Sequence, residues 1–233
     1  MTILTRAQKG SALSHAEMDE NITDLRDGVN IMVPSQQNKG VKVDSLGTPS
    51  FGWHDLHGQL TWSDNEVDSA TLQAYNGFIK QLKFSENKNV NVCFHLPHDY
   101  NIGSDLFFHV HWSHASSTVT GGSVTWAFEM VGAKGHNQGA FFAPKTISIV
   151  HNASTTQYQH MIAETSMSVS GGSLTEIDTD TLEPDYMIFG RLYLDSNDIT
   201  DSVIQPDVFV HFVDLHYQST AVPTKNKTPN FWT

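Results

Sequence analysis

Histidines at alternate positions mark one stretch of the sequence, Leu106–His114, which reads LFFHVHWSH. The run is rich in aromatic and β-branched residues and has turn-forming residues on both sides, so it predicts a β-strand. Because side chains alternate between the two faces of a strand, we expect His109 and His111 on one face and Val110 and Trp112 on the other. Two imidazoles at this spacing can hold one metal ion.

Three explanations compete for this pair: a metal site, a pH-dependent switch and plain packing. If His109 and His111 are metal ligands, a homotrimer would gather three such pairs around one ion on its axis. Further residues are able to complete a ligand shell: His95, His98, His211, Asp214 and His216. The packing explanation treats the rings as half-polar aromatics on a wet sheet face or a subunit interface. It is favoured because the sequence has no recognisable zinc motif, and we expect no cofactor beyond such a structural ion.

Catalytic patterns are missing from the sequence. It contains no G-x-S-x-G, no P-loop and no H-E-x-x-H, and these are the motifs with an understood mechanism. Cys93 and His95 share a strand face, but this spacing alone does not make a nucleophile and base. The sequence therefore predicts a non-enzymatic protein. A cupin-like metal enzyme is an alternative that requires His109 and His111 to line the interior of a barrel.

Charge and composition exclude several classes of partner. The chain has 233 residues and a formal net charge of −12. An acidic chain disfavours nucleic acid as a partner, because phosphate contacts need Lys and Arg. The single cysteine, Cys93, rules out an intrachain disulfide framework. There is no apolar run long enough for a membrane span, and residues 1–14 are too polar for a signal peptide. We expect a protein made in a reducing cytoplasm.

The first secondary-structure element that the sequence predicts is a helix over residues 15–27. Ser14 and Glu17 have the spacing of a capping box, and Gly28 is expected to end the helix. An apolar stripe on this helix consists of Met18, Ile22 and Leu25. A helix this short is marginal alone in water, so we expect the stripe to anchor the helix on a neighbour.

The remainder of the chain predicts an all-β fold. We expect residues 1–28 to form an N-terminal arm and anchoring helix, 29–58 a linker and entry segment, 59–220 a β-sandwich and 221–233 an extended tail. Nine strands are expected, at 59–62, 78–84, 90–96, 106–113, 124–131, 146–151, 159–165, 186–194 and 207–217. Many short strands separated by turn signals favour a jelly-roll-like β-sandwich with one short helix.

The tail, residues 221–233, combines charge with aromatic residues. Its two prolines disfavour regular structure. Phe231 and Trp232 are costly to leave in water, and Lys225 and Lys227 add positive charge to an acidic protein. We expect this tail to dock on an acidic surface of the next subunit or of a host shell, with Trp232 in an apolar pocket.

Two sets of motifs resemble proteins of tailed bacteriophages. The segment Lys9–Leu25, KGSALSHAEMDENITDL, resembles an N-terminal segment common in phage tail fibres and other virion proteins. The phrases GTPSFGWHDLHG, FHLPHDY, HVHWSH, AKGHNQG, YQHMIAE, HYQST and TKNKTPNFW are similar to a family of uncharacterised phage structural proteins. Neither resemblance brings catalytic residues.

The resemblance implies a non-enzymatic structural protein of the virion, made in the host cytoplasm. We expect a homotrimeric capsid decoration or head-fibre protein that binds other virion proteins such as the major capsid or tail proteins. Two alternatives stay open: a tail-fibre or tail-associated protein, and a carbohydrate-binding module whose exposed aromatic residues attach to host glycans.

Overall fold

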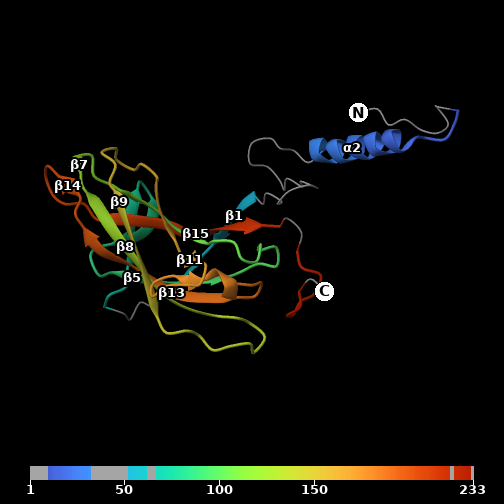
Figure 1. The fold of residues 1–233 in the computed structure, drawn as a ribbon. Helices are drawn as coiled ribbons and strands as arrows, with labels where there is room; N and C mark the ends of the chain where they lie inside the picture. Colours follow the sequence, from blue (N-terminus) through green and yellow to red (C-terminus); the bar gives the residue numbers. More distant parts are fainter. Residues whose placement is uncertain (1–9, 33–51, 62–66, 221–222, 232–233) are drawn as a thin grey trace. The chain divides into compact units, whose positions relative to one another are not determined.

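The computed structural model describes residues 10–32, 52–61, 67–220 and 223–231. For residues 24–32 it describes the backbone but not the side chains. By its contacts the chain separates into two units. One contains the N-terminal helix, and the other contains the β-sheets (Figure 1). Each unit is described separately below.

The helix α2 spans His15–Met32 and begins at the predicted cap. The Ser14 backbone N–H donates to Glu17 Oε2 at 2.7 Å, and the Glu17 N–H donates to Ser14 Oγ at 3.3 Å. These reciprocal bonds satisfy two donors that a helix start leaves without partners. The predicted end was wrong, because the helix continues through Gly28. Glycine weakens a helix interior without necessarily breaking it.

Two antiparallel sheets contain most of the strands. The larger has the order β10-β6-β15-β4-β3, with β1 also pairing with β15, and the other has the order β2-β5-β13-β8-β9. Strands of the larger sheet are β1 (Gly52–His57), β3 (Thr71–Asn76), β4 (Ile79–Phe84), β6 (Phe107–His114), β10 (Met161–Ser166) and β15 (Val208–Ser219). Strands of the five-stranded sheet are β2 (Gln59–Thr61), β5 (Asn89–His95), β8 (Ser123–Ala133), β9 (Lys145–Asn152) and β13 (Met187–Asn197).

Short elements occupy the connections. The strands β7 (Val119–Gly121) and β14 (Thr200–Asp201) form an antiparallel pair. A parallel pair consists of β11 (Ser168–Val169) and β12 (Ile177–Asp178), and a 3₁₀ helix, η1, follows at Thr179–Thr181. The fold is therefore a jelly-roll-like β-sandwich, which confirms the predicted class.

The core lies between the two sheets and is rich in aromatic rings. Phe108 of β6 stacks on Phe128 of β8, with ring centroids 4.4 Å apart and an interplanar angle of 12°. Trp112 of β6 meets Trp126 of β8 edge-on at 6.2 Å, and both indoles are fully buried. Close packing of large rings from both layers is what joins the sheets into one sandwich.

Gly58 is the point where the chain passes from one sheet to the other. It follows β1, which pairs with β15, and precedes β2, which pairs with β5. A Cβ placed at Gly58 would lie 2.7 Å from the Phe94 ring and 2.8 Å from Val213, one core residue from each sheet. Only glycine fits this crossing. Within the predicted linker and entry segment, 29–58, the structure places the strand β1, while residues 33–51 lie outside the described residues.

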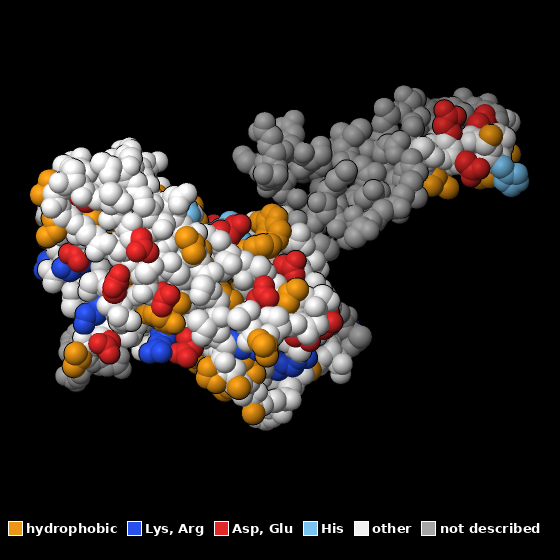
Figure 2. Space-filling model, turned by 60° about the vertical axis from the view of Figure 1, so that its left-hand side comes forward, with side chains coloured by type: hydrophobic (Ala, Val, Ile, Leu, Met, Phe, Trp, Pro, Cys, Tyr) orange, Lys and Arg blue, Asp and Glu red, His pale blue; other side chains and the backbone are white. Residues whose placement is uncertain are grey.

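The molecular surface agrees with the acidic composition. On the face drawn in Figure 2, Lys and Arg side chains are few, and hydrophobic side chains occur in small separate groups among polar ones. Among the described residues, no helix is both long and apolar enough to span a membrane.

Candidate functional site

The histidines of β6 lie on the outer face of the larger sheet. Val110 and Trp112 point into the core, which puts His109 and His111 on the opposite face, as the alternation predicts. Both histidines are nevertheless buried, at 3% and 6% exposure, under side chains of neighbouring strands. The barrel-interior position that a cupin-like enzyme requires is not the one they occupy.

A β-bulge in β15 decides which residues join them. The register with β6 shifts between Val210 and Phe212, so the backbone of His211 is not paired with a residue of β6. An extra residue changes the face of everything that follows it in the strand. Asp214 consequently lies directly opposite His109, and His216 follows on the same face. Simple alternation along the sequence would have separated His211 from His216.

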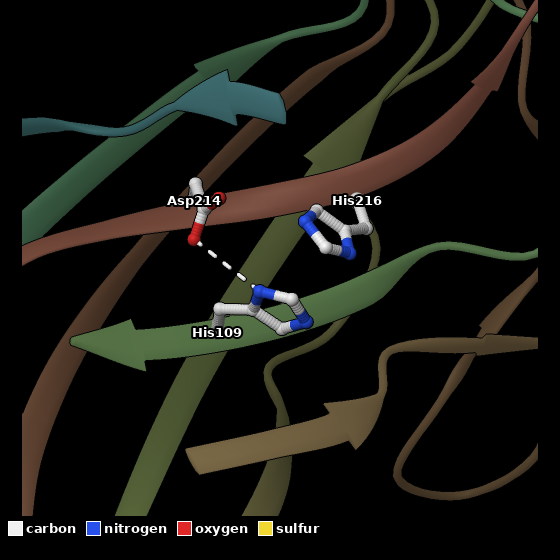
Figure 3. A group of neighbouring side chains, drawn as sticks. All are labelled: His109, Asp214 and His216. Carbon is white, nitrogen blue, oxygen red and sulfur yellow. Dashed lines mark ion pairs between the residues drawn. The ribbon is translucent and has the colours of Figure 1, made fainter. Parts of the chain in front are cut away.

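His109, Asp214 and His216 form a compact group (Figure 3). A ring nitrogen of each histidine and a carboxylate oxygen all lie within 4.8 Å of one another. Nδ1 of His109 is 3.6 Å from Asp214 Oδ1, and the two imidazole rings are 3.9 Å apart. Asp214 is 2% exposed, whereas the His216 side chain is 34% exposed. The group is thus buried on one side and accessible on the other.

Carboxylates also contact the far side of the group. Nε2 of His109 lies 2.5 Å from Glu164 Oε2, an oxygen on the adjacent strand β10. Nε2 of His216 pairs with Asp55 of β1. Both acids are more than half exposed. Carboxylate partners of this kind fix the orientation and the protonated nitrogen of an imidazole.

His111 has a different role from His109. Its Nε2 lies 3.0 Å from Asp214 Oδ1, and its Nδ1 lies 2.7 Å from His160 Nε2. The ring also stacks on Phe212, with centroids 3.9 Å apart. Both nitrogens are therefore engaged within the chain. Burial, followed by the charge of His111, lowers the pKa of His160.

A serine–histidine contact lies beside this network. Ser113 Oγ is 2.9 Å from His211 Nε2 and 2.7 Å from the Tyr75 hydroxyl. A hydroxyl bonded to an imidazole is the pair that activates a nucleophile. Ser113 is fully buried, however, so its hydroxyl is closed to a substrate in this structure. Burial, with the charges of His160 and His111, lowers the pKa of His211.

The other histidines considered as ligands lie in a second cluster. Nε2 of His95 and Nε2 of His98 each lie 3.2 Å from Asp185 Oδ1, and His136 Nε2 lies 2.8 Å from Asp185 Oδ2. Burial raises the pKa of Asp185, but the hydrogen bond from His136 and the charges of His98 and His95 outweigh it and lower the pKa. His95 and His98 therefore contact Asp185 and do not belong to the group of His109, Asp214 and His216.

The tail residue Phe231 packs on this second cluster. It is 4% exposed, and its ring meets the His98 ring edge-on at 5.7 Å and the His136 ring at 6.2 Å. Lys225 and Lys227 are exposed, and neither forms an ion pair with the described residues. Trp232 lies outside the described residues, and docking on another subunit or a shell stays a prediction.

The anchoring stripe is exposed where its side chains are described. Met18 and Ile22 are 39% and 64% exposed. The side chain of Leu25 lies outside the described residues, although its backbone belongs to α2. The side chains of Met18 and Ile22 are therefore available to a partner.

A groove on the outer face of the five-stranded sheet was not foreseen from the sequence. Pairing of β2, β5, β13 and β8 produces two rows of outward side chains, one polar and one mixed. The polar row is Thr61, Asn91, Arg191 and Glu129, and the mixed row is Gln59, Cys93, Phe189 and Val131. Together with Pro144 they line a groove of about 640 Å³. The outward-facing residues could be identified from the sequence of each strand, but only the register between strands shows that they form a groove.

Aromatic rings and polar groups are both available in this groove. Phe189 is 42% exposed, and its ring contacts Phe141, which is 50% exposed, at 5.6 Å. Arg191 Nε donates to Glu129 Oε2 at 2.7 Å, which orients the guanidinium. Within the described part of the chain, the Asn91 side chain has no hydrogen-bond partner. The groove can therefore cover an apolar surface and hydrogen-bond a polar edge.

Comparisons with known proteins give distant structural likenesses. No family model matches the chain, and no curated protein does either. One similar structure is the CBM22-1–GH10 part of Clostridium thermocellum xylanase 10B complexed with xylohexaose, at 9% identity and a TM-score of 0.33. The match covers 75% of this chain and 27% of that one. Another is the xylan-binding module CBM15, at 8% identity and a TM-score of 0.32, covering 72% of this chain and 97% of that one. Neither likeness identifies a ligand for this chain.

Proposed function

We propose that the β-sandwich is a non-enzymatic carbohydrate-binding module and that the groove across β2, β5, β13 and β8 is its binding site. One observation carries the proposal: the exposed ring of Phe189, which contacts the exposed ring of Phe141, lines a groove together with the planar polar side chains of Asn91 and Arg191. A sugar ring has apolar C–H faces and a polar hydroxyl edge. Aromatic and planar polar side chains recognise these two parts respectively.

Each side chain has a distinct role in this proposal. The ring of Phe189 covers one face of a sugar unit, with Phe141 extending the same apolar wall. Arg191 donates to a pair of neighbouring hydroxyls, and the ion pair with Glu129 holds its guanidinium in place. Asn91, beside Arg191 in the polar row, offers both a donor and an acceptor. All but Phe141 lie in the rows of a sheet, which keeps their spacing rigid.

A glycan array with the purified full-length chain tests this function, followed by calorimetric titration of any glycan retained. We expect Phe189→Ala to weaken binding by at least about tenfold, which corresponds to about 1.4 kcal/mol. Arg191→Lys should also weaken it, because lysine keeps the charge but loses the fork of donors. The matched control is Phe78→Ala, since Phe78 is 95% exposed in the turn between β3 and β4, outside the groove.

Two results would contradict the proposal. One is an array on which the folded chain retains no glycan. The other is a bound glycan whose affinity falls equally in the Phe78 and Phe189 variants, because the groove would then not be the site.

A second candidate role concerns the particle to which such a module would be attached. The exposed Met18 and Ile22 of α2 support attachment through the N-terminal helix, because apolar side chains on one helix face are a common docking surface. Together with the resemblance to phage virion proteins, they support a homotrimeric structural protein of a tailed-phage particle, on the capsid or on the tail. The sandwich would then present its groove to host glycans.

Deleting residues 1–28 tests the attachment. We expect the truncated chain to keep the β-sheet signal in circular dichroism but to be lost from particles. Normal incorporation of the truncated chain would place the anchor elsewhere. Light scattering of the full chain tests the trimer separately, and a mass near the 25.9 kDa of one chain would refute it.

A further inference from the structure

We propose that His109, Asp214 and His216 form a zinc site within a single chain. Two imidazole nitrogens and one carboxylate oxygen, all within 4.8 Å of one another, match the three protein ligands of an open zinc site. The site differs from a pair of His109 and His111 on a threefold axis, because each chain supplies a complete set of ligands.

The contacts of the two His109 ring nitrogens support a cation at this point. Glu164 Oε2 lies 2.5 Å from Nε2, and a carboxylate at that distance places the ring proton on Nε2. The other nitrogen, Nδ1, then presents a lone pair toward Asp214. It is buried and has no hydrogen-bond partner among the described residues. At 3.6 Å, the Nδ1–Oδ1 distance is too long for a hydrogen bond.

Two electron-rich atoms facing each other in a buried position are unfavourable unless a positive charge lies between them. A proton on Nδ1 or a metal ion can supply it. The group favours the metal, because a ring nitrogen of His216 also lies within 4.8 Å of a ring nitrogen of His109 and an oxygen of Asp214, which makes three potential ligand atoms around one point. Figure 3 shows both rings and the Asp214 carboxylate grouped on β6 and β15.

The surroundings provide the outer contacts of a metal site. Glu164 holds the far nitrogen of His109, and Asp55 pairs with His216. His111 donates to the Asp214 oxygen at 3.0 Å, which orients the carboxylate. Contacts of this type usually hold metal ligands in place. Three carboxylates near one point, those of Asp55, Glu164 and Asp214, also favour a divalent cation electrostatically.

His216 determines the access and the role of the site. Its side chain is 34% exposed, so an ion can enter from the surface of the sheet. With three protein ligands, a fourth position would remain for water or for a ligand atom of a partner. The ion would join β6 to β15 in the part of β15 that follows the bulge, so it would stabilise the folded state.

Zinc binding to the full-length chain, first treated with EDTA, tests the inference. We expect one zinc per chain by mass spectrometry of metal content after dialysis, and a rise in the unfolding temperature with added Zn²⁺. His216→Ala should abolish both effects, and Asp214→Asn should weaken them. The control His15→Ala changes a histidine on α2 and should retain both. Circular dichroism in EDTA shows whether each variant is folded, and His216 is the safer change because it is partly exposed.

The stoichiometry distinguishes the possible outcomes. One ion per three chains, retained by His216→Ala, would overturn the proposal in favour of an axial site made by His109 and His111. No binding by the folded wild-type chain would also overturn it. Equal loss in the His15 and His216 variants would show unspecific binding.

Discussion

Phe231 lies edge-on against His98, with ring centroids 5.7 Å apart, and this contact holds tail residues 223–231 on the sandwich. The backbone supports it, because the Thr224 N–H donates to the His98 carbonyl oxygen at 3.0 Å. A terminal segment is often poorly ordered unless something binds it. Here a buried aromatic ring and a main-chain hydrogen bond do so.

The first prediction follows from this contact. Phe231→Ala should lower the free energy of unfolding by about 1.5–3 kcal/mol, the value of burying one large apolar side chain. Urea unfolding followed by circular dichroism measures the change. Lys227→Ala is the matched control in the same tail, and as an exposed residue it should alter stability by less than about 0.5 kcal/mol. Equal stability of wild type and Phe231→Ala would show that the tail does not dock this way in solution.

A second prediction concerns acid stability. A hydrogen bond from Ser116, helped by the Val203 N–H and others, lowers the pKa of Asp201 to about 2 from an ordinary 3.8. A carboxyl whose pKa is lower in the folded chain contributes stability above its unfolded pKa. That contribution is present above pH 3.8 and is lost as the pH falls toward 2.

Unfolding of wild type and Asp201→Asn at several pH values checks this. The free energies of unfolding of the two proteins should differ most near neutral pH and converge as the pH falls toward 2. The variant removes only the titrating group and keeps a similar shape. A difference that stays constant across this range would mean that Asp201 is not the titrating group involved.

The third prediction tests the cap of α2. Ser14→Ala removes the oxygen that accepts from the Glu17 N–H, and losing such a cap costs about 1 kcal/mol of helix stability. Hydrogen exchange of the full chain should show faster exchange for amides of the first helical turn. Ser11→Ala, a change just outside the helix, should leave these rates unaltered. If both variants exchange alike, the capping box does not stabilise the helix.

Local patterns predicted much of this fold. Each of the nine expected strands overlaps an observed one, because alternating apolar residues and turn residues act over a few positions. The capping box of Ser14 and Glu17 was also predictable, because it depends only on two residues three positions apart in the sequence. The burial of Trp112 and Trp126 followed from the same alternation.

Features that depend on pairing between distant strands were not predicted. The bulge at His211 brings Asp214 and His216 to His109, and nothing in β15 alone reveals it. The Asp185 cluster requires two loop residues, His136 and Asp185, with positive φ values of 54° and 64°. Such backbone conformations are rare outside glycine and are imposed by tertiary contacts. The groove likewise exists only once β5, β13 and β8 are in register.

The last prediction concerns Gly190, which lies in β13 beneath the groove, between Phe189 and Arg191. A Cβ at this position would lie 2.5 Å from the Glu129 carbonyl oxygen and 2.5 Å from the Phe128 ring. That ring cannot easily move, because it stacks on Phe108 at 4.4 Å in the centre of the core. Overpacking of this kind typically costs about 1–3 kcal/mol, so Gly190→Ala should lower the free energy of unfolding by at least that much. Gly139→Ala is the control, since a Cβ there meets nothing within 4 Å. If the Gly190 variant is as stable as the Gly139 variant in urea unfolding, β13 and β8 do not pack as closely as this structure shows.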